Sequence, residues 1–356
     1  MTIDTTKLRE LAQKATPAPQ RTGDEQSDRG MQMTREHNIV SVSGGKDSTA
    51  TLAVAVTLEV ENLQAVFADT GNEHPLTYEY VDYLSDWLQR QGHKPIRKIK
   101  ADFTADLARR REYLLGVASG EHADKFGKLR HTPESAAIAA DAMQPTGNPF
   151  LDLVLLKGRF PSTMRAFCSE ELKRNPIIEQ VMLPLMDKGD LIMSWQGIRR
   201  EESLKRRRAA ECEEVGGGLF NYRPILRWNV ADVFEAHRYM GLKPNPLYSM
   251  GMGRVGCMPC INARKDELRE IADRFPEQIE RIAEWERIAC QTSKCGAATF
   301  FCVSDLGESK TENAYATGNI VQFVKWSRTS NGGSNLDLFR QGLEVPACSS
   351  MYGLCE

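Results

Sequence analysis

The fold of this 356-residue chain is decided by residues 38–48, which read Asn-Ile-Val-Ser-Val-Ser-Gly-Gly-Lys-Asp-Ser. The first six residues form a short β-branched run, and residues 48–58 form an apolar segment with helical composition. Two glycines between a strand and a helix allow a tight turn whose backbone N–H groups point at one anion, and the helix N-terminus adds partial positive charge. The stretch therefore predicts a phosphate-binding loop. A plain glycine turn that caps a helix is the alternative.

The loop offers both backbone and side-chain donors to a phosphate. No Gly-Lys-Ser or Gly-Lys-Thr occurs at the spacing of a Walker A loop, so a different type of phosphate loop is expected. The candidate nucleotide-binding residues of the loop are Ser43, Gly44, Gly45, Lys46, Asp47 and Ser48. Lys46 and Asp47 are also candidate catalytic residues, because charge stabilisation at the phosphates would carry most of the catalysis.

Strands and helices alternate after the loop. Residues 63–68 have the pattern of a second buried strand, residues 76–91 that of an amphipathic helix and residues 95–99 that of a third strand. This alternation over about 60 residues predicts an α/β fold with a doubly wound parallel sheet. Residues 191–197 are expected to add another strand, and residues 230–240 another helix.

Changes in composition divide the chain into three expected parts. Residues 1–36 are polar and predict a flexible N-terminal arm. Residues 37–240 are expected to form the nucleotide-binding α/β domain, within which the loop-rich segment 102–160 predicts an insertion or mobile lid. Residues 241–356 are expected to form a cysteine-bearing helical region, in which residues 266–290 predict one long amphipathic helix.

Composition and charge exclude several classes of protein. Apolar residues make up 41% and charged residues 26% of the chain, and a net charge of −2 gives no overall attraction to nucleic acid. No apolar run reaches the roughly 18–20 residues of a membrane span, and the N-terminal residues lack the apolar core of a secretory signal. We therefore expect no membrane partner and a cytoplasmic location. In that reducing compartment the nine cysteines favour metal binding or redox chemistry over disulfides.

The loop and the segment after the second strand resemble a known family. Ser-Gly-Gly-Lys-Asp-Ser is similar to the PP-loop of the N-type ATP pyrophosphatases, which bind ATP and split it between the α- and β-phosphates. Residues 67–78, Phe-Ala-Asp-Thr-Gly-Asn-Glu-His-Pro-Leu-Thr-Tyr, resemble the phosphoadenosine phosphosulfate reductase family within that group. The resemblance places Asp69, Thr70 and Gly71 against the nucleotide or its metal, at a strand end where such folds bind nucleotides. A helix-capping role for Asp69 is the alternative.

Three later blocks extend the resemblance over about residues 38–262. Cys168-Ser-Glu-Glu-Leu-Lys-Arg-Asn-Pro176 is similar to the family's Cys-x(n)-Lys-x-x-Pro segment. Residues 195–203 (Trp-Gln-Gly-Ile-Arg-Arg-Glu-Glu-Ser) and 222–233 (Tyr-Arg-Pro-Ile-Leu-Arg-Trp, then Asp-Val) are similar to two further blocks of that family. The first of these two blocks implies nucleotide contacts by Gly197, Arg199 and Arg200.

One departure narrows the reaction that the resemblance implies. The sulfonucleotide reductases of the family end in Glu-Cys-Gly-Leu-His, which nothing in this chain matches, and their phosphate loop has lost the Gly-Gly-x-Asp-Ser that this chain retains. The resemblance therefore favours ATP-using members, such as the sulfur-inserting enzymes of DNA phosphorothioation or tRNA thiolation. It implies ATP and Mg²⁺ as cofactors, adenylation of an acceptor with release of pyrophosphate, and transfer of sulfur to a nucleic acid.

Two other functions stay open. A reductase of adenylyl sulfate or phosphoadenylyl sulfate would act on a sulfonucleotide substrate with a thioredoxin-like reductant, and Cys348 or Cys355 would be its catalytic nucleophile. A non-catalytic nucleotide-sensing subunit would bind ATP without turning it over. A sulfur-transferring enzyme would instead need a sulfur donor as a partner, and a homodimer is a further expected assembly.

The cysteines indicate a metal centre. Cys257-Met-Pro-Cys260 places two thiolates about one turn apart, which suits a single metal centre. Cluster-bearing relatives gather three or four cysteines, so the resemblance implies a [4Fe–4S] cluster. Zinc held by four thiolates, a redox dithiol and unligated thiols are the alternatives. The candidate ligands are Cys168, Cys257, Cys260 and Cys348, with Cys355 as the substitute for Cys348.

Three further features leave alternatives open. The basic stretch 199–208, at helical spacing, predicts a cationic wall beside phosphates, a contact with a nucleic-acid backbone or a solvated helix face. Residues 251–256 spell Gly-x-Gly-x-x-Gly, but they follow a proline-rich turn and lead into Cys257, so a dinucleotide site is not expected. His74 is expected either to touch the nucleotide or to pack its own loop.

Overall fold

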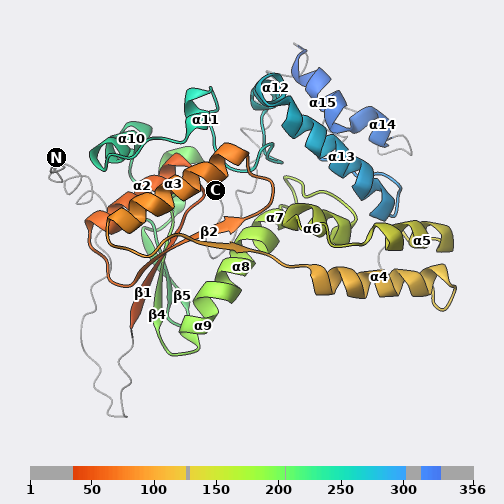
Figure 1. The fold of residues 1–356 in the computed structure, drawn as a ribbon, viewed down its shortest axis with the longest axis horizontal. Coiled ribbons are helices and arrows are strands. Elements are labelled where there is room, and N and C mark those ends of the chain that lie inside the picture. Colours follow the sequence, from red (N-terminus) through yellow and green to blue (C-terminus); the bar gives the residue numbers. More distant parts are fainter. Residues whose placement is uncertain (1–34, 126–128, 205, 302–313, 330–356) are drawn as a thin grey trace.

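The computed structural model describes residues 35–125, 129–204, 206–301 and 314–329. One part of the molecule is built on a six-stranded sheet with the strand order β3-β2-β1-β4-β6-β5 (Figure 1). The strands are β1 (Glu36–Ser41), β2 (Leu63–Asp69), β3 (Arg97–Lys100), β4 (Leu191–Trp195), β5 (Cys212–Gly216) and β6 (Leu219–Tyr222).

The sheet is parallel except at one edge. In its middle β1 pairs in parallel with β2 and β4, so that Val40 lies opposite Ala65 on one side and Trp195 on the other. β3 and β6 continue the parallel part, and β5 pairs with β6 in antiparallel orientation. The β5–β6 hairpin was not expected from the sequence, although glycines with positive φ at 216–218 are a recognisable hairpin signal.

Helices cover both faces of the sheet. Side chains alternate between the two faces along each strand, and the strands carry apolar side chains on both. Val40 and Phe67 point to a face packed against three helices, and Ile39 and Val66 point to the opposite face, packed against residues 177–182. The three helices are α2 (Lys46–Thr57), α3 (Pro75–Arg90) and α10 (Val230–Tyr239). This arrangement confirms the predicted α/β fold with a doubly wound parallel sheet.

The helical segment on the second face is irregular. It consists of α7 (Phe167–Ser169), the π-helix η1 (Glu170–Arg174), α8 (Asn175–Ile177), the π-helix η2 (Ile178–Met182) and α9 (Leu183–Met186). Pro176 and Pro184 lie within it, and their missing N–H groups interrupt the regular α-helical ladder. Single π turns often occur at functional sites, and η1 carries Lys173.

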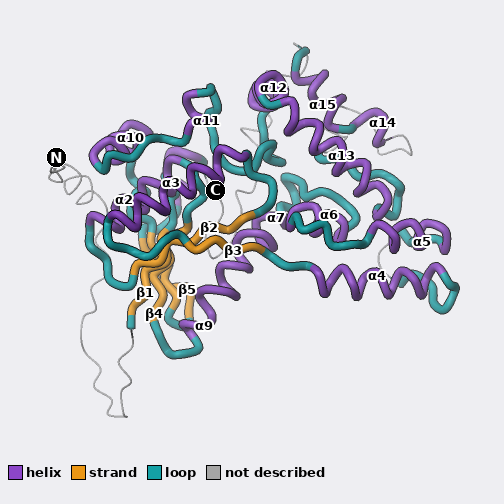
Figure 2. The backbone as a smooth tube through the Cα atoms, in the orientation of Figure 1, coloured by secondary structure: helices purple, strands orange, loops and turns teal. Residues whose placement is uncertain are grey.

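The second part of the molecule is helical and lies beside the carboxyl end of β2 (Figure 2). Its apolar core contains Leu107, Leu153, Ile282 and Phe300, which come from two distant stretches of sequence. The helices are α4 (Thr104–Ala118), α5 (Pro133–Ala142), α6 (Pro149–Lys157), α12 (Lys265–Arg274), α13 (Pro276–Thr292), α14 (Ala314–Gly318) and α15 (Ile320–Ser327).

Two sequence-based expectations differ from this arrangement. The segment 102–160, expected to be loop-rich, contains three helices that share one core with α12 and α13, because its alanines and leucines face those helices. Its expected role as an insertion or mobile lid stays a prediction. The expected single helix over 266–290 is two helices, since Pro276 cannot continue α12 and begins α13 instead. The domain boundary at residues 240 and 241 stays a prediction.

The arm formed by residues 1–34 lies outside the described residues. Among the helices that the structure describes, none combines the length and the apolar composition needed to cross a membrane.

Candidate nucleotide and thiol site

The phosphate loop joins the carboxyl end of β1 to the N-terminus of α2, as predicted. Gly44 has a φ of +78°, and a Cβ atom there would lie 2.8 Å from the Thr77 methyl carbon, so glycine is required on both counts. Gly45 is the N-cap residue of α2 in an extended conformation. The backbone thus makes a tight turn between the end of β1 and the first residue of α2.

The two serines of the loop hold its shape. The Ser48 hydroxyl accepts a hydrogen bond from the Ser43 N–H at 3.1 Å, and the Ser43 hydroxyl accepts one from the Gly45 N–H at 3.3 Å. The two hydroxyl oxygens lie 3.0 Å apart. These bonds fix the backbone of the loop between β1 and α2.

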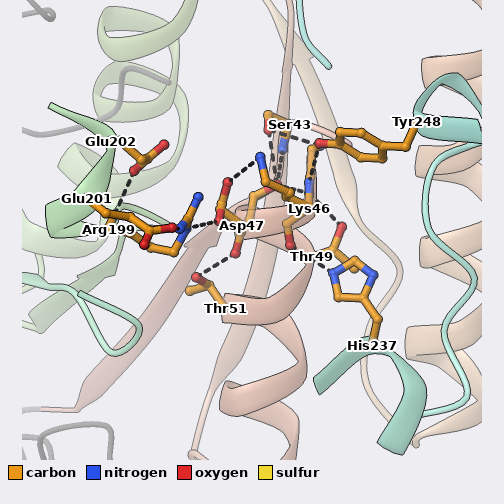
Figure 3. A network of polar contacts seen from close by, with 12 residues as sticks. Ser43, Lys46, Asp47, Thr49, Thr51, Arg199, Glu201, Glu202, His237 and Tyr248 are labelled. Carbon is orange, nitrogen blue, oxygen red and sulfur yellow. Dashed lines mark hydrogen bonds and ion pairs between the residues drawn. The ribbon is translucent and has the colours of Figure 1, made fainter. Parts of the chain in front are cut away.

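Asp47 is buried and ion-paired on two sides (Figure 3). Lys46 Nζ lies 3.2 Å from one carboxylate oxygen, and the buried Arg199 donates from Nε to the other. Arg199 also pairs with Glu201. Since both Asp47 oxygens are engaged, the carboxylate holds Lys46 and Arg199 in place and is poorly placed to act as a base.

The end of β4 approaches the phosphate loop very closely. A Cβ atom on Gly197 would lie 2.8 Å from the Ser48 nitrogen and 2.9 Å from the Asp47 carbonyl carbon, so only glycine fits. Arg200 donates from its backbone N–H to the Leu226 carbonyl at 2.9 Å. Gly197 and Arg199 therefore adjoin the loop as the sequence predicted, whereas the described bonds of Arg200 lie farther along the chain.

A pocket opens beside the loop at the carboxyl ends of β1, β2 and β4. Its walls come from the ends of these strands, from the phosphate loop and from η1. Ligands of open α/β sheets bind at this edge, and the mixture of apolar wall and polar rim suits a nucleotide base and its phosphates. The lining includes Val42, Ser43, Ser48, Phe67, Lys173 and Gly197.

The Asp69-Thr70-Gly71 segment follows β2 at the same edge. Asp69 accepts hydrogen bonds from the Gly71 N–H at 2.9 Å and from the Tyr78 hydroxyl at 2.7 Å, and the Thr70 hydroxyl donates to Glu73 at 2.6 Å. Asp69 therefore stabilises its own turn and does not cap α3.

His74 is the N-cap of α3, because its Nδ1 accepts the Leu76 N–H at 3.1 Å. Its ring packs edge-on against Phe275 with a centroid distance of 4.6 Å. Burial lowers the pKa of His74 against the opposing effect of Glu277. Of the two roles expected for this residue, the structure describes the packing role.

Three of the candidate metal ligands line a second pocket. Cys168 reaches it from α7, and Cys257 and Cys260 reach it from the loop before α12. The Cys257 Sγ lies 3.7 Å from a Glu73 carboxylate oxygen and 3.5 Å from the Thr70 hydroxyl. Cys348 and Cys355 lie outside the described residues.

Burial governs the protonation of these thiols. It raises the pKa of Cys168 to about 11, with Cys260 adding to the effect. It raises the pKa of Cys257 to about 12, although Lys173 opposes the rise. Both groups are therefore neutral thiols at physiological pH when they bind nothing, and any metal would have to displace their protons.

Lys173 lies between the two pockets and lines both of them. Burial alone would lower the pKa of Lys173, but Cys257, Glu73 and Cys260 outweigh it and raise the pKa to about 12. Its ammonium group is therefore charged between the nucleotide pocket and the thiols. The sequence contained this lysine within the Cys-x(n)-Lys-x-x-Pro resemblance, but nothing local indicated that it would join two sites.

The candidate metal-ligating side chains can be compared with the zinc site and the iron–sulfur cluster that the sequence predicted. Among the described residues, no group of three or more His, Cys, Asp and Glu side chains could hold a metal ion. Cys168, Cys257 and Cys260 line one pocket, and the fourth candidate ligand, Cys348, lies outside the described residues. A [4Fe–4S] cluster and a four-thiolate zinc site would each use these three thiols and one more ligand.

The structure also locates the basic stretch 199–208 and the Gly-x-Gly-x-x-Gly stretch 251–256. The basic stretch forms two short 3₁₀ turns, η3 (Arg200–Glu202) and η4 (Arg206–Arg208), and not the helix that its spacing suggested. The Ser203 backbone is extended, which ends the first turn and separates it from the second. The Gly-x-Gly-x-x-Gly stretch lies between α11 (Pro246–Ser249) and Cys257, outside any strand–helix junction.

Comparison with known proteins agrees with this architecture. The model of the phosphoadenosine phosphosulfate reductase domain matches residues 37–263, which is more than half of the chain. The chain therefore belongs to the phosphoadenosine phosphosulfate reductase family. The match runs from β1 to the residues just after Cys260, so it includes both pockets.

Individual relatives differ in how much of this chain they share. An uncharacterized 37.8 kDa protein of Escherichia phage 186 is 43% identical over 90% of this chain and 96% of its own length. An adenosine 5'-phosphosulfate reductase of Burkholderia cepacia is 30% identical over 33% of this chain and 43% of its own length. A phosphoadenylyl-sulfate reductase structure from Candida auris covers 64% of this chain and 84% of its own, with a TM-score of 0.34 and 13% identity.

Proposed function

We propose that this protein binds ATP and Mg²⁺ through the Ser43–Ser48 loop and adenylates an acceptor, with release of pyrophosphate, as the first step of a sulfur transfer. The observation that carries the proposal is the phosphate loop itself. Its Gly44 cannot be replaced without a clash, and its Asp47 is ion-paired with Lys46 and Arg199. That arrangement suits a polyphosphate ligand.

The chemistry follows from the placement of charge. An acceptor oxygen attacks the α-phosphorus, the bond from that phosphorus to the bridging oxygen breaks, and pyrophosphate leaves with the electron pair. The Lys46 ammonium and the loop amides stabilise the charge that develops on the leaving group, and Mg²⁺ would assist. A sulfur nucleophile then attacks the carbon that bears the adenylated oxygen, a carbon–sulfur bond forms, and the carbon–oxygen bond breaks so that AMP leaves with its electron pair.

The adjacency of the two pockets supports the second half of the reaction. Ser43, Lys173 and Gly256 line both the nucleotide pocket and the thiol pocket, so a group activated in one is close to the other. Cys168, Cys257, Cys260 and a fourth ligand would hold a [4Fe–4S] cluster, which would supply a binding site for the sulfur. The Lys173 ammonium would orient anionic groups between the two pockets.

Reduction of a sulfonucleotide is the second candidate function. It is favoured by the relatives described as adenosine 5'-phosphosulfate reductases, which share this domain. The chain spans only 43% and 54% of the length of two of them, so their whole activity is not carried over. The same two pockets would then hold the sulfonucleotide and the reducing thiols, with a thioredoxin-like reductant as partner.

The acceptor in our proposal is a nucleic acid. Arg207 and Arg208 are exposed on η4, in the loop that begins with the pocket residues Gly197 and Ile198. Arginines near the mouth of a phosphate site can neutralise a nucleic-acid backbone. A nucleotide-sensing role without turnover is the outcome that would replace both enzymatic proposals.

Product analysis distinguishes these functions. Reduced, anaerobic protein is incubated with Mg²⁺ and either ATP or phosphoadenylyl sulfate plus thioredoxin, and AMP, pyrophosphate and sulfite are quantified. AMP and pyrophosphate from ATP support the adenylation proposal, and their yield should rise with the correct nucleic acid. Sulfite from the sulfonucleotide would instead establish a reductase. ATP binding without either product would leave only the sensing role.

The cluster has its own test, which does not depend on turnover. We expect anaerobically purified protein to contain iron and acid-labile sulfide, and Cys257→Ser to lose both, because that thiol lines the proposed cluster pocket. Cys212→Ser is the matched control, since Cys212 is half-buried on β5 away from the pocket. Zinc without sulfide in the wild-type protein would refute the cluster.

A further inference from the structure

Tyr248 reaches the phosphate loop from a segment that is 200 residues away in sequence. Its hydroxyl oxygen accepts a hydrogen bond from the Lys46 N–H at 2.9 Å, and Lys46 Nζ lies 5.5 Å from the centre of its ring. Figure 3 shows Tyr248 and Arg199 approaching the loop from opposite sides. One tyrosine therefore contacts both the backbone and the charged group of Lys46.

The neighbours of Tyr248 hold it against the loop. The buried Asn245 caps α11 by accepting the Leu247 N–H at 3.0 Å, and its amide nitrogen donates to the Gly44 carbonyl at 3.2 Å. His237 Nε2 lies 2.8 Å from the Lys46 carbonyl oxygen. The segment 237–248 thus makes hydrogen bonds to three backbone groups of the loop, on both sides of the Lys46 residue.

The Tyr248 hydroxyl is hydrogen-bonded to the backbone amide at the N-terminus of α2. Lys46 is the first residue of α2, so its N–H has no partner within the helix. Phosphates at helix N-termini use donors of this kind. A phenol oxygen at this donor fixes the peptide plane of Lys46 without adding negative charge, whereas a carboxylate there would repel a phosphate.

We propose that Tyr248 is a positioning residue of the phosphate site. It holds the Lys46 peptide and ammonium group in the orientation that binds the phosphate chain of the nucleotide. The inference rests on the proposed function, because it assumes that the loop binds a polyphosphate. It goes further by assigning part of the phosphate site to α11, which lies just before the cysteine-bearing loop.

The test compares two tyrosine variants. Tyr248→Phe keeps the ring, its contact with Lys46 and its edge-on packing against Phe234, and removes only the hydroxyl. Tyr83→Phe is the matched control, because the Tyr83 hydroxyl accepts the Lys243 N–H at 3.1 Å in the same connecting segment but away from the loop. Binding of inorganic pyrophosphate, MgATP and adenosine is measured by titration calorimetry, and thermal unfolding is recorded for each protein.

We expect Tyr248→Phe to weaken binding of pyrophosphate and MgATP by roughly threefold to tenfold, the usual size of one lost neutral hydrogen bond. Adenosine binding should match that of the wild-type protein, and Tyr83→Phe should bind all three ligands as the wild-type protein does. The unfolding midpoint should fall by a similar small amount in both variants, because each loses one hydroxyl that accepts a backbone N–H. Unchanged or tighter pyrophosphate binding would overturn the assignment, as would an equal loss for adenosine. If the wild-type protein binds neither pyrophosphate nor ATP, the proposed function fails as well.

Discussion

At the scale of single residues, the site depends on charges that are buried and compensated. Arg199 is 3% exposed and Asp47 is 5% exposed, so each would be costly to bury alone. Their pairing explains why the loop residue after Lys46 is an aspartate: it keeps both cations beside the place where phosphate oxygens would lie. Lys173 is similar, because burial opposes its charge and the nearby Glu73 carboxylate favours it.

Removing the charge of Asp47 tests this account. Asp47→Asn leaves the Arg199 guanidinium buried with only Glu201 to balance it, so we expect the free energy of unfolding to fall by about 3 kcal/mol. Asp273→Asn is the control, since Asp273 pairs with Arg328 at the surface and should cost less than about 1 kcal/mol. Urea denaturation measures both. Equal losses of unfolding free energy in the two variants would show that the buried ion pair contributes no more to stability than the surface pair.

At the scale of elements, the site is made where strand ends and helix starts meet. β1 and β4 are neighbours in the sheet, and this brings Gly197 against the first turn of α2. Similarly, Asn148 caps α6 by accepting the Phe150 N–H at 3.0 Å and donates to the Gly71 carbonyl at 2.7 Å. Each contact joins the end of one element to the start of another.

Adding one methyl group at Gly197 should push the end of β4 away from α2. In Gly197→Ala the new Cβ would meet backbone atoms that cannot rotate away, so we expect a loss of stability of about 1–3 kcal/mol and weaker nucleotide binding. Gly253→Ala is matched to it, because nothing lies within 4 Å of a Cβ there. Unfolding by urea and calorimetric titration give the two readouts. A Gly197→Ala protein as stable as the Gly253→Ala protein would contradict the close approach.

At the scale of the whole molecule, the helical part and the sheet meet at the site. Arg281 on α13 donates to the Asn72 side chain at 2.8 Å and to the Met258 carbonyl at 2.7 Å, so it joins the loop after β2 to the loop that carries Cys257. Farther along α13, the fully buried Glu286 accepts the N–H groups of Phe300 and Ile320. That carboxylate attaches α15 to the helical core.

Glu286 should make stability depend on pH. Burial raises its pKa from the ordinary value of 4.5 to about 7, so the native state keeps a proton that the unfolded chain releases. Stability from this group is therefore complete below pH 4.5 and is lost as the pH rises through 7. Relative to Glu286→Gln, we expect the wild-type free energy of unfolding to fall by about 2–3 kcal/mol between pH 5 and pH 8.

Urea denaturation at several pH values measures that trend. Glu284→Gln is the control on the same helix, because Arg287 holds the pKa of Glu284 below its ordinary value and its titration ends below this range. The difference between the wild-type and Glu284→Gln proteins should be constant from pH 5 to pH 8. A wild-type protein that gains stability relative to Glu286→Gln over this range would contradict the assignment.

The sequence by itself determined the features that depend on neighbouring residues. The glycine loop between β1 and α2, the alternation of strands and helices and the parallel sheet follow from glycine geometry and short-range apolar patterns, and all three are present in the structure. The resemblance to the family rested on the same local blocks. The block that contains Gly197 and Arg199 was also readable in the sequence, and the structure places both residues beside the loop, while their contacts with a nucleotide stay a prediction.

Only the tertiary structure decided which distant residues share the site. Cys168 meets Cys257 and Cys260 in one pocket, Lys173 joins that pocket to the nucleotide pocket, and Tyr248 holds the phosphate loop. No local pattern marks such residues, because their roles arise from contacts between segments up to about 200 positions apart. The packing of α4–α6 against α13 was hidden for the same reason: an apolar helix face shows that it is buried, but its partner is chosen by the shape and connectivity of the whole chain.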